Sequence, residues 1–238
     1  LLRLRDTQFQ VGSGELAVAA DANLNNQAWQ AQINGNALEL AALSPLLRGI
    51  LTTSIAASGR LTSLTLADTR AQGQIRLSPA IPVSLEGAET LISDPLEAQF
   101  AWTGDTLQVP QVQAGETLAA SGFATLTNTR RGIPAVSGFD FNARLQSFDL
   151  GGIYGLLEAP EWLALAGLVD FDGRLSGTPA APLLAGSLGL RQFAVNQFVL
   201  APEVRGPIRA SLTEGALVDL RGGNTEIYAE IDPSLRPN

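Results

Sequence analysis

The sequence of 238 residues contains no cysteine, histidine, methionine or lysine, so all 15 of its basic residues are arginine. Without histidine or cysteine there is no imidazole base, no thiolate nucleophile and no soft ligand for zinc, haem or an iron–sulfur cluster. Without lysine there is no Schiff base and no phosphate-binding lysine of a P-loop. Carboxylates, hydroxyls, tyrosine and arginine remain for chemistry. With so few reactive types we expect a protein that is not an enzyme and that has no cofactor or metal site.

Positive charge is also scarce, because 23 acidic residues against 15 arginines give a net charge of −8. This balance opposes binding to nucleic acid, whose affinity comes mainly from cationic side chains that meet phosphates. It also opposes binding to anionic membrane surfaces. The composition, 45% apolar and 16% charged, is nevertheless typical of a folded chain.

No apolar run is long enough to span a bilayer. The uncharged run from Leu175 to Leu190, for example, is interrupted by Pro179 and Pro182. The chain begins with Leu1 and lacks the apolar core of a signal peptide. We expect residues 1–238 to be one continuous β-rich fragment of a larger protein, with any membrane anchor outside these residues.

Alternation of apolar and polar residues is the recurring pattern of the chain. Phe139, Phe141, Ala143 and Leu145 alternate with polar residues, and the same period of two recurs at residues 15–20, 29–34, 96–103 and 169–172. Each such strand has one dry face and one wet face, as in antiparallel sheets covered on one side. Turn signals every roughly 10–13 residues predict about 14 strands in a mainly antiparallel, meandering all-β fold.

Two stretches read as short helices. Leucines at mixed spacings of three and four occur in residues 38–47, where Ser44-Pro45 resembles an N-cap followed by proline at the first helical position. The second stretch is residues 150–157, followed by Pro160. We expect both to lie on the sheet as plugs or lids rather than as a helical layer.

An internal repeat links two parts of the chain. Residues 29–47 align with 139–157 at an offset of 110, and Gly59-Arg60-Leu61 then aligns with Gly173-Arg174-Leu175 at an offset of 114. The repeat-like units span about 14–78 and 116–191. Repetition of such a unit favours an elongated architecture, although two unrelated amphipathic hairpin units would also look alike.

A sheet with one dry face must cover that face. It can pack against a second sheet, close into a barrel, or curl into a trough that a ligand completes. Two short helices cannot cover so many strands, and aromatic residues make up only 6% of the chain, too few for the girdles of a transmembrane barrel.

The amphipathic strands, the paired short helices and the segments at residues 166–178 and 185–190 resemble the C-terminal β-rich region of the TamB family and the wider AsmA-like group of bridge-like lipid-transfer proteins. The resemblance implies a "β-taco", an elongated curled sheet with an apolar groove. It also implies a periplasmic or cell-envelope location, with an anchor in the inner membrane through a segment outside this chain, or the equivalent place in a plastid envelope.

The same resemblance implies that the groove carries phospholipid acyl chains between inner and outer membranes, or supports assembly and secretion of outer-membrane proteins with an Omp85-type barrel as partner. The alternatives are a structural β-solenoid or adhesin-like passenger with a filled core and, last, a carboxylate-dependent hydrolase. The residues expected to line the groove are Leu16, Val18, Trp29, Ile33, Phe100, Trp102, Phe139, Phe141, Val169 and Phe171.

Paired carboxylates are the remaining candidates for chemistry. Asp170 and Asp172 lie on one face of a predicted strand together with Arg174. They could serve a glycosidase or bind a hard cation, but a solvated outer face with a same-face Asp–Arg pair is the favoured interpretation. Glu158 and Glu161, beside the second predicted helix, are interpreted as helix-end charges.

Overall fold

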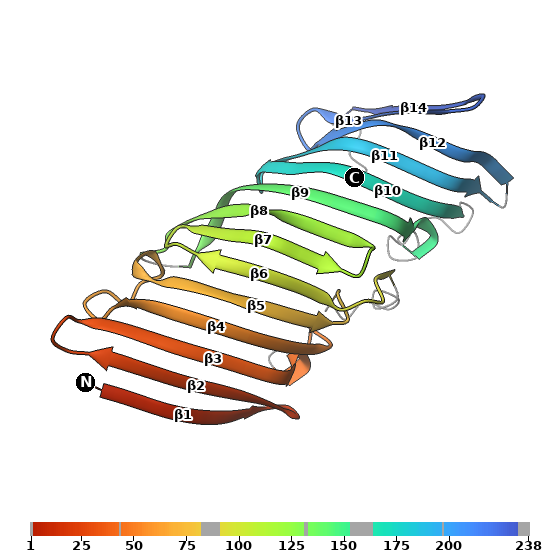
Figure 1. The fold of residues 1–238 in the computed structure, drawn as a ribbon. Coiled ribbons are helices and arrows are strands. Elements are labelled where there is room, and N and C mark those ends of the chain that lie inside the picture. Colours follow the sequence, from red (N-terminus) through yellow and green to blue (C-terminus); the bar gives the residue numbers. More distant parts are fainter. Residues whose placement is uncertain are drawn as a thin grey trace.

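The structure is a computed structural model that describes residues 2–42, 44–81, 91–130, 133–152, 164–196 and 198–232. These residues form a single antiparallel sheet of fourteen strands, in which each strand pairs with its neighbours in the sequence. Figure 1 shows the strands stacked in chain order, from β1 at one end of a long twisted layer to β14 at the other. The predicted all-β, antiparallel meander is confirmed.

The strands differ in length but follow one another with few interruptions. They are β1 (Leu2–Val11), β2 (Gly14–Asn23), β3 (Ala28–Glu39), β4 (Ile50–Arg60), β5 (Arg70–Ser78), β6 (Leu96–Trp102), β7 (Thr106–Ala114), β8 (Leu118–Thr127), β9 (Ala135–Asp149), β10 (Leu165–Thr178), β11 (Ala181–Val195), β12 (Phe198–Ser211), β13 (Gly215–Gly222) and β14 (Thr225–Ile231). Two 3-10 turns are also present, η1 (Leu40–Ala42) and η2 (Leu66–Asp68).

The alternation seen in the sequence becomes two distinct faces of the sheet. In β5, every second residue is exposed and those between are half-buried. Cross-strand pairing keeps this parity, because Ile75 lies opposite Thr53 of β4 and Ala98 of β6, while polar Gln74 lies opposite Ser54 and Gln99. We call the side of Ile75 and Ala98 the apolar face and the other side the polar face.

The first predicted helix is wrong. Strand β3 continues to Glu39, with Leu38 opposite Leu51 of β4, and only the single turn η1 follows. The spacing of leucines resembled a helix because it runs from one element into another. Leu38 lies in the extended backbone of β3 and Leu40 in the turn η1, and both are buried. Ser44 caps a turn, since its Oγ accepts a hydrogen bond from the Leu46 N–H at 3.3 Å. Of the second predicted helix, residues 150–152 are helical, and residues 153–157, with Glu158 and Glu161, lie outside the described residues.

The buried core lies along one margin of the apolar face. Because successive strands reverse direction, the connections after β3, β5 and β9 all lie along the same margin, which we call the covered margin. The connections bring Ala80 and Ile92 onto the sheet. One core cluster consists of Ala80, Ile92, Ala114, Phe148 and Val169. A second consists of Ala201, Val204 and Leu220.

Two β-bulges occupy corresponding places in the two repeat-like units. In β3 the pairing with β4 shifts by one residue between Gly35 and Leu38, and Ala37 has a φ of +50°. In β9 the pairing with β10 shifts between Leu145 and Phe148, and Ser147 has a φ of +53°. Ala37 and Ser147 are equivalent at the sequence offset of 110. Such a bulge adds a residue, so apolar side chains three apart point to the same face.

The core clusters predict where truncation costs stability. Phe148→Ala should lower the free energy of unfolding by about 3–5 kcal/mol, because the side chain is 7% exposed and its loss leaves a cavity. Phe123→Ala is the matched control, since Phe123 lies on the polar face opposite Asp140 and is 41% exposed. It should change the free energy of unfolding by less than about 1 kcal/mol. Urea denaturation followed by tryptophan fluorescence measures both, and equal losses would contradict the assigned core.

Candidate functional site

A row of small and apolar residues crosses the whole sheet at right angles to the strands. Each strand contributes one residue, and each residue is the direct cross-strand partner of the next. We call this set the central row: Phe9, Leu16, Gly35, Thr53, Ile75, Ala98, Val112, Ala120, Ala143, Gly173, Gly186, Ile208, Val218 and Ala229.

Thr53 is the one polar member of the central row. Its hydroxyl donates a hydrogen bond to the backbone carbonyl of Gln74 at 3.0 Å. The donor is therefore satisfied within the sheet, and no charged side chain interrupts the row from β1 to β14.

A row of larger residues runs beside the central row on the side of the covered margin. Most of its members are leucines, and we call it the leucine row: Leu38, Leu51, Leu77, Leu96, Ala114, Leu118, Leu145, Phe171, Leu188 and Gly206. Several of its members pack against the core of the covered margin. The small side chains of the central row therefore lie beside taller ones over β3 to β11.

Aromatic rings on the apolar face lie against glycines instead of standing away from the sheet. A Cβ atom added at Gly59 would lie 2.8 Å from Nε1 of Trp29, its cross-strand partner. A Cβ at Gly122 would likewise lie 2.7 Å from Cδ1 of Phe141, again its partner. Aromatic–glycine pairs of this kind shield backbone that a glycine leaves bare.

All ten residues predicted to line a groove lie on the apolar face, where Val18 and Ile33 are cross-strand partners. Only Leu16 belongs to the central row, and Phe171 belongs to the leucine row. Val169 is 9% exposed within the core cluster, and Phe171 is 8% exposed. The remaining predicted residues are half-buried and spread over β2, β3, β6 and β9: Val18, Trp29, Ile33, Phe100, Trp102, Phe139 and Phe141.

The sequence pattern alone did not predict the central row, because many of its members are small residues that lie between larger apolar ones. Its signal is nevertheless present, since a small residue lies two positions from a large one on the same face, as Ala98 does before Phe100 and Ala143 after Phe141. Which small residues become neighbours depends on the pairing of strands, and the bulges set that pairing.

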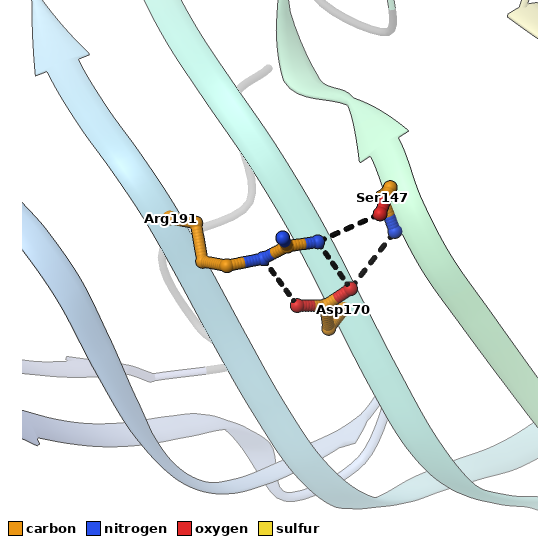
Figure 2. Close-up of polar contacts among 3 residues, drawn as sticks. All are labelled: Ser147, Asp170 and Arg191. Atoms are coloured by element: carbon orange, nitrogen blue, oxygen red, sulfur yellow. Dashed lines mark hydrogen bonds and ion pairs between the residues drawn. The ribbon is translucent and has the colours of Figure 1, made fainter.

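The polar face carries Asp170 in a network that joins three strands. Figure 2 shows Asp170 of β10 between Ser147 of β9 and Arg191 of β11. Asp170 accepts hydrogen bonds from the Ser147 backbone N–H at 2.8 Å and from Nε of Arg191 at 2.8 Å. Arg191 also donates to Oγ of Ser147 at 2.7 Å. The network occupies the bulge of β9, whose Ser147 N–H would otherwise lack its ladder partner.

The electrostatics of this network favour a charged carboxylate. Partial burial raises the pKa of Asp170, but the hydrogen bonds from Ser147 and Arg191, together with the positive charges of Arg191 and Arg205, outweigh it and leave the pKa below its ordinary value. A general acid requires the opposite shift. Asp172 pairs instead with Arg144 at 2.9 Å, and Arg174 pairs with Asp140. The predicted pair within this strand is therefore wrong, because Asp170, Asp172 and Arg174 each pair with a neighbouring strand.

Shallow hollows of the described surface lie on the polar face. One of about 670 Å³ lies over β1 to β5 and is lined by alanines together with polar residues such as Arg5, Gln32 and Gln72. Another, of about 600 Å³, surrounds Asp170 and Asp172. The apolar face is half-buried, and the apolar groove expected from the sequence is not shown.

Metal and membrane features are absent from the described part of the chain. It contains no group of three or more acidic side chains placed to hold a metal ion. None of its helical segments is long and apolar enough to cross a membrane.

Comparisons with known proteins add no family. No protein-family model, no curated protein and no solved structure matches this chain.

The Asp170 network predicts an acid-sensitive contribution to stability. Asp170→Asn should lower the free energy of unfolding at pH 7 by about 1.5–3 kcal/mol, the range for hydrogen bonds to charged groups. Because the pKa of Asp170 is lowered in the folded state, this contribution is complete above its unfolded pKa and is lost as pH falls through the folded value. The difference between wild type and variant should therefore shrink below about pH 4.

Asp172→Asn is the control for this experiment. The Asp172 side chain is 65% exposed against 20% for Asp170, so its pair with Arg144 should contribute only about 0–1 kcal/mol. Urea denaturation at pH 7 and at pH 3 measures both variants. An equal difference in the free energy of unfolding between wild type and Asp170→Asn at the two pH values would contradict a stabilising role of the charged Asp170 carboxylate.

Trp29 and Trp102 of the apolar face differ in whether the indole N–H has a hydrogen-bond acceptor, so its loss should cost different amounts of stability. Nε1 of Trp102 donates to the Leu66 carbonyl at 2.8 Å, whereas Nε1 of Trp29 is buried without an acceptor among the described residues. Both replacements by Phe remove a similar volume. Trp102→Phe should therefore be the more destabilising by about 1–3 kcal/mol, as measured by thermal and urea unfolding. A larger loss for Trp29→Phe would show that its indole has a partner.

Proposed function

We propose that this protein is a non-enzymatic segment of an envelope-spanning protein, and that its apolar face carries phospholipid acyl chains between two membranes. The observation that carries the proposal is the central row, which runs without a charge across all fourteen strands. The resemblance to the TamB family supplies the rest of the proposal: a periplasmic location, an inner-membrane anchor outside this chain and an outer-membrane barrel as partner.

The length and chemistry of the central row suit acyl chains. Thirteen strand-to-strand steps of about 4.8 Å give a path of about 62 Å. Each methylene removed from water gains about 0.8 kcal/mol. Because the row carries no charge and Thr53 turns its hydroxyl to the backbone, an acyl chain lying along the row meets no charged group from strand to strand.

The large accessible surface of the protein supports an apolar face that other parts of the chain cover only in part. The accessible surface is 14996 Å², and a compact monomer of 24.9 kDa exposes about 10,000 Å². The described core lies along the covered margin. Near the opposite margin of the apolar face, Ala31, Ala57 and Ala71 are only half-buried. A single-layer sheet of this kind has room for a ligand on its apolar face.

The polar face supports a passive role. Its carboxylates pair with arginines across strands, as Asp172 does with Arg144 and Asp170 with Arg191. The lowered pKa of Asp170 keeps that group from donating a proton near neutral pH. This arrangement favours a structural outer wall over a hydrolase.

A structural element with a filled core is the second candidate. The cluster around Phe148 favours it, because connecting segments there bury the apolar face without any ligand. The two candidates differ in whether the central row contacts lipid.

Adjacent alanines of β8 provide a matched test. Ala120 lies in the central row opposite Ala143, and Ala119 lies on the polar face opposite Arg144. A carboxylate placed against an acyl chain is desolvated, so Ala120→Asp should reduce bound phospholipid at least tenfold, which requires a cost of only about 1.4 kcal/mol. Ala119→Asp should leave it unchanged. Native mass spectrometry of protein purified from membranes, before and after delipidation, measures the bound lipid.

A second pair of variants guards against misfolding of Ala120→Asp. The chain has no cysteine, so Ala120→Cys and Ala119→Cys each accept one small fluorophore. Brominated phosphatidylcholine should quench the label at position 120 and not that at position 119. Equal quenching at both positions, or protein that carries no phospholipid, would establish the filled structural element instead.

A further inference from the structure

A hollow on the polar face carries more hydrogen-bond donors than the described chain uses. It has a volume of about 600 Å³, lies over β9 to β12, and its lining includes the three residues of Figure 2. The lining also holds three arginines and two aspartates in all, a net charge of +1, in a chain whose net charge is −8. From these donors and this charge we propose that the hollow binds a phosphate monoester. The proposal does not depend on lipid transport along the apolar face.

Arg205 of β12 is the arginine of the hollow that is not paired with a carboxylate. Its guanidinium reaches across Gly189, its cross-strand partner in β11. A Cβ atom added at that glycine would lie 3.4 Å from Nε and 3.8 Å from Nη2 of Arg205. The Arg205 side chain forms no ion pair or hydrogen bond with the described residues. Its five N–H groups are therefore available to a ligand in the hollow.

Further donors come from β9 and β11. Oγ of Ser147 accepts a hydrogen bond from Arg191, so the Ser147 O–H can donate to a ligand. Nε and Nη2 of Arg191 bond to Asp170, which leaves the N–H groups of Nη1. Ser187 adds an exposed hydroxyl to the same lining. Donors from three strands thus surround the hollow.

The carboxylates of the hollow are already hydrogen-bonded. Oδ1 of Asp170 accepts from the Ser147 backbone N–H and from Nη2 of Arg191, and Oδ2 accepts from Nε of Arg191. Asp172 accepts two hydrogen bonds from Arg144. Donors are therefore in excess, and a ligand that satisfies them must supply several acceptor oxygens and negative charge.

A phosphate monoester fits this set of donors better than other oxyanions. Its three terminal oxygens point in different directions, which suits donors that lie on three strands, whereas the two oxygens of a carboxylate lie in one plane. It carries a charge of about −1.5 to −2 at pH 7. Arginine binds such a group through parallel N–H donors. A phosphodiester offers only two free oxygens and a single charge.

Glu203 is the nearby charge that opposes an anion. It is the cross-strand partner of Arg191 and lies two residues before Arg205 on the same face of β12. Its carboxylate forms no ion pair with the described residues and lies outside the lining of the hollow. Repulsion between Glu203 and a bound phosphate lowers the affinity, so removal of the Glu203 charge should strengthen binding.

Substitution of Arg205 tests the site. Isothermal titration calorimetry of the wild-type chain with glycerol 3-phosphate, in a chloride buffer of low ionic strength, should show saturable binding that weakens with added salt. Arg205→Gln should weaken this binding at least tenfold, because it removes the unpaired guanidinium. Arg209→Gln is the matched control and should leave binding unchanged, since Arg209 lies on the same face of β12 but pairs with Glu214 at 2.8 Å. No saturable binding by the wild type, or equal losses in both variants, would overturn the proposal.

A gain of affinity tests the same site in a way that misfolding cannot imitate. Glu203→Gln should strengthen the binding of glycerol 3-phosphate about twofold or more, because a negative charge beside the bound phosphate is removed. The same titration measures this variant. Unchanged or weaker binding would show that the phosphate does not lie beside β12 and would contradict the assigned site.

The class of ligand is tested with a phosphodiester. Glycerophosphocholine carries the headgroup phosphate of a phospholipid without its acyl chains. It should bind at least fivefold more weakly than glycerol 3-phosphate, because it has one terminal oxygen and one charge fewer. Equal or tighter binding of glycerophosphocholine would overturn the assignment to a monoester and would make the hollow a site for a lipid headgroup.

Discussion

The structure depends on one constraint, the parity of cross-strand pairing. Side chains alternate between the faces of a strand, so a slip of a single residue anywhere in the sheet would turn every later apolar side chain to the polar face. The central row shows that this parity is kept from Phe9 to Ala229 through all fourteen strands. The cross-strand apolar rows and the interstrand ion pairs, such as Arg144–Asp172, follow from it.

The bulges are the places where this parity is at risk. Strand β7 contains Pro110, which cannot donate to the ladder, and a pairing shift occurs between Val109 and Val112. The spacing of three keeps both valines on the apolar face. In β9 the shift between Leu145 and Phe148 is held by Asp170 and Arg191 from the next two strands. In the first repeat-like unit, Ala56 and Ser78 stand at the positions that correspond to Asp170 and Arg191, so that support belongs to the second unit.

The sequence predicted the strands well because each carries its own period-2 pattern, as in the run from Phe139 to Leu145. It failed at the ends of such runs. A bulge at Ala37 followed by a 3-10 turn gives leucines the same mixed spacing as a short helix, and nothing about alanine signals a positive φ. The sequence predicted the apolar face but not the central row within it. The neighbours of Ala98 or Ala143 in that row depend on how their strands pair with others. The burial of Val169 depends likewise on Ile92 and Phe148, which lie far from it in the sequence.

On the polar face, the cations that pair with carboxylates are all arginines, because the sequence contains no lysine. Arginine offers two parallel N–H donors to one carboxylate, whereas lysine offers a single flexible ammonium. Arg191 donates from Nε to Oδ2 and from Nη2 to Oδ1 of Asp170. Arg144 donates from the same two nitrogens to the single oxygen Oδ2 of Asp172. Each pair joins neighbouring strands and fixes the direction of both side chains. A sheet that is one layer thick has no second layer to hold its strands in register, and bidentate pairs on the polar face give it a directional contact that leaves the apolar face free of charge.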